Sequence, residues 1–223
     1  MENGDFVKIE FVGRVKDTGE IFDLTDKELA KKEGIYNDKS KYAPSLVIIG
    51  SGGVISGVED QLKTMKVGEK REFEVPYTNA FGKRDPALIK IVSMRKFIEN
   101  KMNPVPGQFV TIDGATCKIQ AVSGGRIRVD FNSPLAGKDL KYEVKLVEKL
   151  TEPRTRVEAL LESYGIEADT KVEGEKAELK FKKPNPHLEK FVEGLVKEWI
   201  KEIKIVSFVK EEKQAANSEE SKK

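Results

Sequence analysis

The segment from Ile48 to Glu69 has the spacing most suggestive of chemistry, because five glycines stand there among branched apolar residues. A glycine-rich turn that leads into a helix is typical of phosphate sites, where backbone N–H groups hold the anion. A P-loop needs Lys-Ser/Thr after its last glycine, and a dinucleotide turn needs G-x-G-x-x-G directly after a strand. Neither pattern is present, and Val54 and Ile55 stand where the phosphate would bind. The spacing therefore favours an apolar ligand at this helix N-terminus.

The chain has few cysteine and histidine residues, which serve most often as nucleophiles, bases and zinc ligands. Cys117 and His187 are the only cysteine and the only histidine, so neither an intrachain disulfide nor an ordinary zinc site can form. We expect Cys117 to be a small core residue on a strand, and His187 to stand at a helix start after two prolines. The sequence predicts no metal, no cofactor and a reducing compartment.

Composition limits the partners. The 223 residues suffice for one large domain or two to three small ones, and the net charge of +2 does not favour nucleic acid. The segment MENGDFVKIE has no apolar core of a signal peptide, and no run of 18 apolar residues occurs. We therefore expect a cytoplasmic protein that does not bind a membrane.

The elements that must position the glycine turn follow from periodicity. Alternating apolar and polar positions predict strands, which cover residues 6–15, 21–23, 46–49, 70–75 and 140–150. In the last strand one side is expected to carry Leu140, Tyr142, Val144, Leu146 and Leu150. A short amphipathic helix is predicted over 58–65, and residues 26–43 form a polar surface excursion with one helical turn.

The pattern changes after Gly82. We interpret 85–98 as a mobile apolar connector, followed by three short strands with hairpin turns between them, over 109–112, 116–122 and 126–131. The strand at 140–150 matches the early strands better than it matches these. We therefore expect the small β module to be inserted into the first domain.

A third region follows Pro153, with elements in the order helix, strand, helix, strand. They are predicted over 154–164, 175–182, 186–200 and 203–209. One face of the second helix should carry Leu188, Phe191, Val192, Leu195 and Trp199. The polar residues 211–223 are predicted to be disordered.

Six ordered sequence pieces resemble the FKBP-type peptidyl-prolyl cis-trans isomerases. They are V-x-I-x-F-x-G at 7–13, G-x-x-F-D at 19–23, G-x-G-x-V-I-x-G-x-E at 50–59, M-x-x-G-E at 65–69, A-F-G at 80–82 and P-L-A-G-K-x-L-x-Y-x-V at 134–144. The insertion after Gly82 resembles the insert-in-flap domain of the SlyD-like subgroup, and the C-terminal extension resembles the long archaeal members.

This resemblance implies an α+β fold, in which an antiparallel sheet wraps on a short helix. Residues 1–85 and 132–151 would form the isomerase domain, and 86–131 an inserted all-β chaperone domain. Residues 152–210 would form a C-terminal α+β extension domain, followed by the tail at 211–223.

The resemblance also implies an enzyme, a peptidyl-prolyl cis-trans isomerase (EC 5.2.1.8) with chaperone activity on unfolded or folding proteins. Carried over residue by residue, its catalytic residues are Asp23, Phe81 and Tyr142. Its substrate-binding residues are Phe11, Phe22, Val54, Ile55 and Val58 in the pocket, with Leu88, Ile91 and Met94 on the insert. The backbone N–H of Ile55 would donate to a substrate carbonyl.

This chemistry needs neither a nucleophile nor a proton transfer. The barrier is amide resonance, about 18–20 kcal/mol, and the twisted amide carries less separated charge than the planar one. An apolar pocket that removes water and fits the twisted shape therefore favours the transition state.

Departures from the family pattern leave alternatives open. Phe11 and Phe81 stand where many members have tyrosine, and Val58 stands where larger members have tryptophan. A holdase-type chaperone or peptide-binding protein with little isomerase activity is therefore one alternative. Lysine-rich faces leave a ribosome- or RNA-associated factor as another. The expected partners are proline-containing or unfolded polypeptides, and a homodimer through the C-terminal domain is left open.

Overall fold

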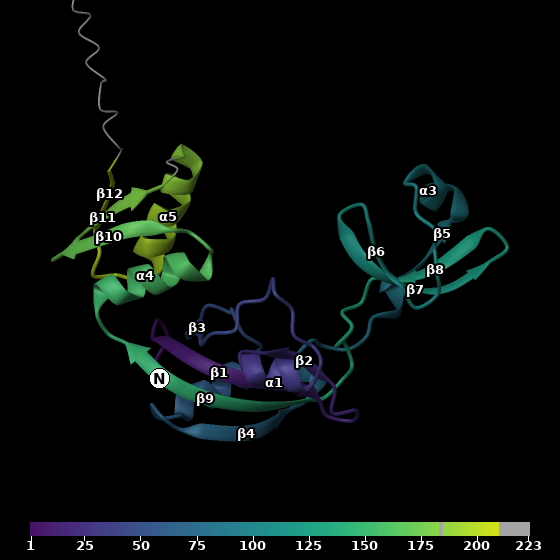
Figure 1. The fold of residues 1–223 in the computed structure, drawn as a ribbon, viewed down its shortest axis with the longest axis horizontal. Coiled ribbons are helices and arrows are strands. Elements are labelled where there is room, and N and C mark those ends of the chain that lie inside the picture. Colours follow the sequence, from purple (N-terminus) through teal and green to yellow (C-terminus); the bar gives the residue numbers. More distant parts are fainter. Residues whose placement is uncertain (183–184, 210–223) are drawn as a thin grey trace, which may run out of the picture.

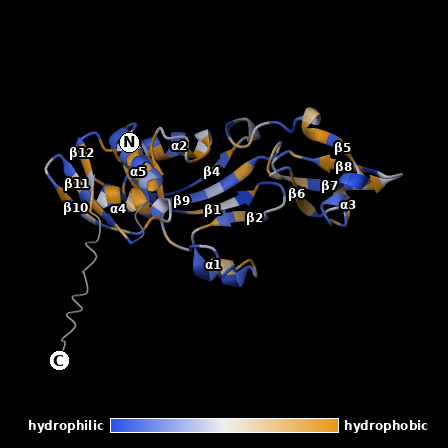
Figure 2. Cartoon of the chain, turned by 90° about the horizontal axis from the view of Figure 1, so that it is seen from above, coloured by the Kyte–Doolittle hydropathy of each residue, from blue (hydrophilic) through white to orange (hydrophobic). Residues whose placement is uncertain are grey.

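Three separate β-sheets organise the molecule. The computed structural model describes residues 1–182 and 185–209, and Figure 1 shows the sheets as three groups of strands. The largest sheet lies in the middle, with the inserted segment at one end and the C-terminal segment at the other (Figures 1 and 2). No helix among the described residues is long and apolar enough to cross a membrane.

The central sheet is antiparallel throughout. Its strands are β1 (Phe6–Val15), β2 (Ile21–Leu24), β3 (Ser45–Ile48), β4 (Lys70–Val75) and β9 (Leu140–Leu150). Their order is β2-β1-β9-β4, and β3 pairs with the other half of β1 on the side where β2 lies. Strand β9 therefore returns between β1 and β4, which confirms that the strand after the insert completes the first sheet. The excursion between β2 and β3 contains the short helix α1 (Lys27–Lys32), as predicted.

The core of this part forms between the sheet and helix α2 (Ser56–Thr64). Val7 and Ile9 point from β1 toward Val58 and Leu62 of the helix, and all four side chains are buried. Gly57 lets the helix approach β4 closely, because a Cβ atom there would lie 2.4 Å from Cγ1 of Val75. The alternation in β1 thus predicts the buried face of the sheet.

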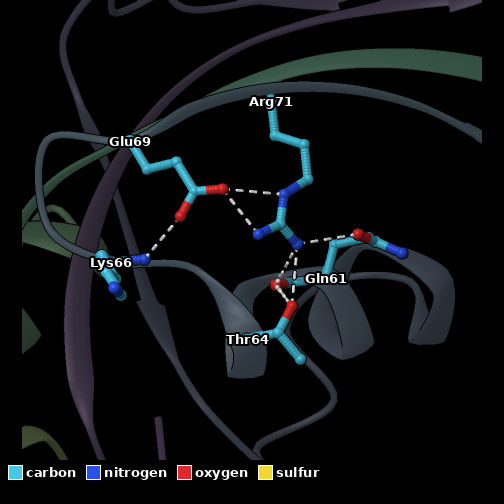
Figure 3. A network of polar contacts seen from close by, with 5 residues as sticks. All are labelled: Gln61, Thr64, Lys66, Glu69 and Arg71. Atoms are coloured by element: carbon cyan, nitrogen blue, oxygen red, sulfur yellow. Dashed lines mark hydrogen bonds and ion pairs between the residues drawn. The ribbon is translucent and has the colours of Figure 1, made fainter.

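A polar network ties the far end of α2 to β4 (Figure 3). The Arg71 guanidinium donates to Gln61 Oε1 at 3.0 Å and to Thr64 Oγ1 at 2.7 Å. Its Nε also donates to Glu69 Oε1 at 2.9 Å, and Glu69 Oε2 accepts from the Lys66 N–H at 2.9 Å. Since Arg71 lies on β4 and Gln61 and Thr64 on α2, this network fixes the helix against the sheet.

One predicted feature of β9 is wrong. Lys8 of β1 faces Glu148, whereas Ile9 faces Leu146, so β9 carries one extra residue at this point. A bulge of this kind reverses which side chains face the core beyond it. Leu146 consequently packs against α2, whereas Leu150 packs into the C-terminal core instead of sharing that side.

The insert forms its own four-stranded sheet in the order β5-β8-β7-β6. Its elements are the 3₁₀ helix η2 (Pro86–Leu88), β5 (Ile89–Ser93), α3 (Met94–Glu99), β6 (Phe109–Ile112), β7 (Ala115–Ser123) and β8 (Arg126–Asp130). Cys117 is buried on β7 as expected, and burial raises the pKa of its thiol.

The prediction of a mobile connector over 85–98 is wrong. Strand β5 pairs with β8 along its whole length, and Phe97 of α3 is completely buried. A five-residue edge strand followed at once by a six-residue helix leaves too short a stretch of either periodicity to be recognised.

The C-terminal segment has the order helix, strand, strand, helix, strand. Its elements are α4 (Pro153–Ser163), β10 (Ala168–Glu173), β11 (Lys176–Phe181), α5 (Pro186–Trp199) and β12 (Ile205–Phe208). The order predicted from the sequence omits β10, whose only buried residue is Thr170, so that no apolar alternation marks it. Strand β10 runs antiparallel to β11, whereas β12 runs parallel to it.

Of two predictions for helix α5, one is confirmed and the other is wrong. His187 stands in its first turn as predicted, and its N–H donates to Asn185 Oδ1 at 2.9 Å. Phe191 does not share the buried face, because its side chain is 46% exposed and lies edge-on to Tyr164. The predicted disorder over 211–223 lies outside the described residues.

The C-terminal segment and the central sheet share one hydrophobic core. Phe6 and Leu150 of the central sheet pack with Val157 and Leu160 of α4. The insert, by contrast, has a separate core around Phe97. Helix α4 is therefore fixed relative to β1 through buried contacts.

Candidate functional site

A cavity of about 430 Å³ opens between the central sheet and the N-terminus of α2. Predicted residues supply much of its lining: Phe11, Asp23, Val54, Ile55, Val58, Phe81 and Tyr142. They come from β1, β2, the glycine turn, α2, the loop after β4, and β9. The tertiary structure therefore brings together residues that are 131 positions apart at the extremes, Phe11 and Tyr142.

The glycine turn positions the apolar side chains as the sequence predicts. Gly50 and Gly52 have φ values of +86° and +70°, which residues with a Cβ rarely adopt. Ile55 caps α2 with extended backbone. No intramolecular acceptor for its N–H is found in the described parts of the chain. A free backbone donor thus stands beside Val54 at the wall of the cavity.

Tyr142 is the centre of an aromatic cluster. The centroid of its ring lies 6.2 Å from that of Phe11, 5.8 Å from that of Phe22 and 6.2 Å from that of Phe73. Phe22 does not line the cavity. Its ring packs over Gly13, where a Cβ atom would lie 2.6 Å from Phe22 Cζ. Phe22 therefore lies close to Gly13 and meets the Tyr142 ring edge-on.

Phe73 is a member of this cluster that the sequence reasoning missed. It lies directly opposite Tyr142 in the pairing of β4 with β9, with the two rings nearly parallel. The alternation in KREFEV indicates the side on which Phe73 points. Only the register between β4 and β9 identifies its neighbour.

Loss of contact with water raises the pKa values of two ionisable groups at the cavity, Asp23 and Tyr142. Desolvation raises the pKa of Asp23, although the Leu24 N–H donates to this carboxylate and opposes the shift. Burial also raises the pKa of Tyr142 to about 12, and the nearby Asp23 charge adds to the effect. The phenol is therefore a neutral donor at physiological pH, beside a carboxylate that remains partly open to solvent.

The predicted binding residues of the insert lie apart from this cavity. Leu88 and Ile91 are 38% and 68% exposed, respectively, whereas Met94 packs partly against the insert's own core. Met94 is therefore less available to a client than predicted. Three further apolar residues of the insert are exposed, namely Ile98, Val105 and Phe109.

Comparisons with known proteins show which family this chain resembles. The sequence model of a family described as "FKBP26, IF domain" matches residues 90–135. A "Short-type peptidyl-prolyl cis-trans isomerase" from Methanocaldococcus jannaschii is 32% identical over 146 residues, which make up 66% of this chain and 92% of that relative. The chain belongs to the FKBP-type peptidyl-prolyl cis-trans isomerase family.

Two bacterial members of the FKBP-type family are also similar. The "FKBP-type 16 kDa peptidyl-prolyl cis-trans isomerase" of Escherichia coli is 34% identical over 47% of this chain and 73% of its own length. "FKBP-type peptidyl-prolyl cis-trans isomerase SlyD" of the same species is 30% identical over 54% of this chain and 63% of its own length. The predicted family, fold class and enzyme class are therefore confirmed, and the FKBP-type match over 90–135 falls on the inserted sheet.

Proposed function

We propose that the cavity beside α2 binds the proline ring of a client polypeptide and accelerates cis-trans isomerisation of the preceding amide. One observation carries this proposal: the cavity is walled by aromatic and branched apolar side chains around a free backbone donor. Such a site removes water from the planar amide, whose separated charge water stabilises, and so favours the twisted transition state.

The proposed roles follow from the positions of the groups. Val54 and Val58 form the floor of the pocket, with Phe11 as a wall, and the Ile55 N–H donates to a substrate carbonyl. The Tyr142 hydroxyl, kept protonated by burial, supplies a second donor. Asp23 orients the substrate at the partly open edge.

Phe81 closes the rim of the pocket and is 40% exposed. A phenylalanine there contributes surface but no hydrogen bond, which keeps the holdase alternative relevant. The availability of the Tyr142 hydroxyl favours the isomerase, because one donor remains within the pocket.

We also propose that the insert captures unfolded segments of the client. Exposed apolar side chains are gathered on this small module, namely Leu88, Ile91, Ile98, Val105 and Phe109. Exposed apolar residues concentrated on one small unit are typical of protein-binding sites. Capture near the pocket raises the effective concentration of prolines in the client.

The proposed domain division is 1–85 with 132–151, 86–131 and 152–210, and the three sheets support it. The relative described as short-type matches 66% of this chain, which supports a long form with a C-terminal extension. A cytoplasmic location, the lack of a nucleic-acid partner and the homodimer stay predictions from the sequence.

The test compares a proline-containing tetrapeptide with a protein whose refolding is limited by proline isomerisation. We expect acceleration of both at catalytic amounts of the full chain. Replacing Ile91 and Ile98 together with serine should slow catalysis on the protein client but leave the tetrapeptide unaffected. Val67→Ser is the matched control, since Val67 is 55% exposed but lies outside the insert.

The outcomes separate the hypotheses. If the chain suppresses aggregation but accelerates neither substrate, the holdase alternative is correct. If the double serine variant loses equal activity on the peptide and on the protein, the insert does not act by capturing clients.

A further inference from the structure

Two segments of the chain connect the insert to the central sheet, and Figure 1 shows both running between them. Residues 82–88 lead out to β5, and residues 130–137 lead from the end of β8 back toward β9. We call these two segments together the neck. At the end near the central sheet, the Gly137 N–H donates to the Gly82 carbonyl at 2.8 Å. Because hydrogen bonds join the two segments, the neck differs from a pair of flexible linkers.

Asn132 ties the two segments together in the middle of the neck. Its Oδ1 accepts from the Asp85 N–H at 2.8 Å, and its Nδ2 donates to the Asp85 carbonyl at 2.9 Å. The side chain thus bonds both backbone groups of one residue on the opposite segment, as a paired strand does. Asp85 in turn caps the 3₁₀ helix η2, because its Oδ1 accepts from the Ala87 N–H at 2.8 Å. The neck is therefore continuous with the first element of the insert.

A buried carboxylate fixes Asn132 from the side of the insert. Asp130 is 2% exposed, and its Oδ1 accepts from the Asn132 N–H at 2.9 Å and from Asn132 Nδ2 at 2.7 Å. Its Oδ2 accepts from Gln120 Nε2 of β7 at 2.8 Å and pairs with the Arg84 guanidinium. Hydrogen bonds to an ionised acceptor are stronger than those between neutral groups. One carboxylate therefore joins both segments of the neck to the sheet of the insert.

The other end of the neck begins at the rim of the prolyl pocket, the cavity beside α2. Phe81, which lines that cavity, directly precedes Gly82. The Gly82 N–H donates to the Tyr77 carbonyl at 2.8 Å, and the Tyr77 N–H donates to Asp139 Oδ1 at 2.9 Å. The loop that carries Phe81 is thus held by contacts that do not involve Asn132. A substitution of Asn132 should loosen the neck and leave the rim of the pocket in place.

We propose that Asn132 and Asp130 are positioning residues that hold the insert in one orientation relative to the prolyl pocket, so that a client captured on the insert presents its prolines to the pocket. This inference rests on the proposed function, because it requires both the pocket and capture by the insert. Leu88, 38% exposed, stands at the insert end of the neck, so exposed apolar surface begins there. The effective concentration of one site at another depends on the length and stiffness of the connection. Loosening the neck should therefore slow catalysis on protein clients without changing either site.

The test uses the full chain and two variants of Asn132. Asn132→Ala removes the side-chain bonds to Asp85 and Asp130 and keeps the backbone bond to Asp130. Asn132→Asp keeps an acceptor for the Asp85 N–H but has no donor, and it places a second carboxylate beside Asp130. Asn100→Ala is the matched control, because Asn100 Nδ2 donates to the Lys96 carbonyl at 2.8 Å within the insert, away from the neck.

The first readout is backbone amide relaxation measured by NMR, which reports how the insert tumbles. Wild type and Asn100→Ala should show one rotational correlation time for the insert and the central sheet, whereas both Asn132 variants should show a shorter time for the insert. The second readout is catalysis. In both Asn132 variants, kcat/KM on a protein client limited by proline isomerisation should fall at least about threefold, because the effective concentration falls. On a proline-containing tetrapeptide, kcat/KM should stay at the wild-type value.

The inference is overturned if the insert of wild type already tumbles separately, if it still tumbles with the central sheet in both Asn132 variants, or if separate tumbling leaves catalysis on the protein client unchanged. Hydrogen exchange of the buried Phe97 and Ile119 amides should match wild type in every variant. Loss of that protection in both Asn132 variants would also contradict the inference, since Asn132 would then stabilise the insert itself. Failure of the proposed function is distinguishable from all of these, because wild type would then not isomerise the tetrapeptide.

Discussion

Tyr142→Phe tests the pocket most directly, because it removes one hydroxyl and keeps the ring. The ring contacts with Phe11, Phe22 and Phe73 remain in the variant. No partner for the hydroxyl is found within residues 1–182 and 185–209. The free enzyme therefore loses no intramolecular hydrogen bond in this variant.

The expected size of the effect follows from the single hydrogen bond to substrate. A net hydrogen bond contributes about 0.5–1.5 kcal/mol. Since about 1.36 kcal/mol changes a rate tenfold, kcat/KM should fall by about twofold to about thirteenfold. The free energy of unfolding should change by less than about 0.5 kcal/mol, as for substitutions without lost contacts.

The assay is isomerisation of a proline tetrapeptide at substrate concentrations below KM, with chemical denaturation of the same samples. Tyr142→Ala is the contrasting variant, and loss of the buried ring should lower the free energy of unfolding by about 3–5 kcal/mol. Since the pKa of Tyr142 is about 12, kcat/KM should show no titration of this phenol between neutral pH and about pH 11. Wild-type kcat/KM in Tyr142→Phe would refute the donor role, and a large loss of stability would show that the hydroxyl is structural.

Two further predictions concern the carboxylates of Asp23 and Asp130. Because desolvation raises the pKa of Asp23 above its ordinary 3.8, the folded state binds the proton more tightly, and stability falls as pH rises from 3.8 through the folded-state pKa. Asp23→Asn should therefore have a higher Tm than wild type at neutral pH and an equal Tm below pH 3.8, and a lower Tm at pH 7 would contradict this. Asp130 is 2% exposed and pairs with Arg84, and its Oδ1 accepts from the Asn132 N–H at 2.9 Å, where the insert joins the central sheet. Asp130→Ala should destabilise the insert by about 1–3 kcal/mol in hydrogen exchange, because its partners lose their acceptor. The exposed Glu99→Ala should change this by less than about 0.5 kcal/mol, and similar losses in both variants would refute a special role for Asp130.

The local sequence is sufficient to predict an element and its buried face where one side-chain periodicity extends over several residues. Strand β1 alternates between apolar and polar residues from Val7 to Phe11, and that pattern alone predicts the face that packs against α2. The glycine turn was recognised as an apolar site because Val54 and Ile55 replace the groups that bind phosphate. In both cases the determining property belongs to neighbouring residues, namely side-chain period or backbone freedom.

Prediction from the sequence fails where an element is short, and where pairing with another strand determines the face on which a side chain lies. The sequence predicts a connector where β5 lies, because its five residues form an edge strand with exposed Ile91. Leu150 was assigned to the wrong side because the extra residue in β9 is visible only against β1. A bulge is a property of two strands together, so neither sequence contains it alone.

The sequence by itself determined the family, the α+β class and most of the residues that line the cavity beside α2, because motifs and periodicity are local. The tertiary structure decided which aromatic rings meet: Phe73 reaches Tyr142 through the pairing of β4 with β9, and Phe22 meets the same ring edge-on. The tertiary structure also placed α4 against the central sheet through the shared core around Phe6 and Leu150. Contacts between segments far apart in the chain depend on strand register and core packing, which no local pattern encodes.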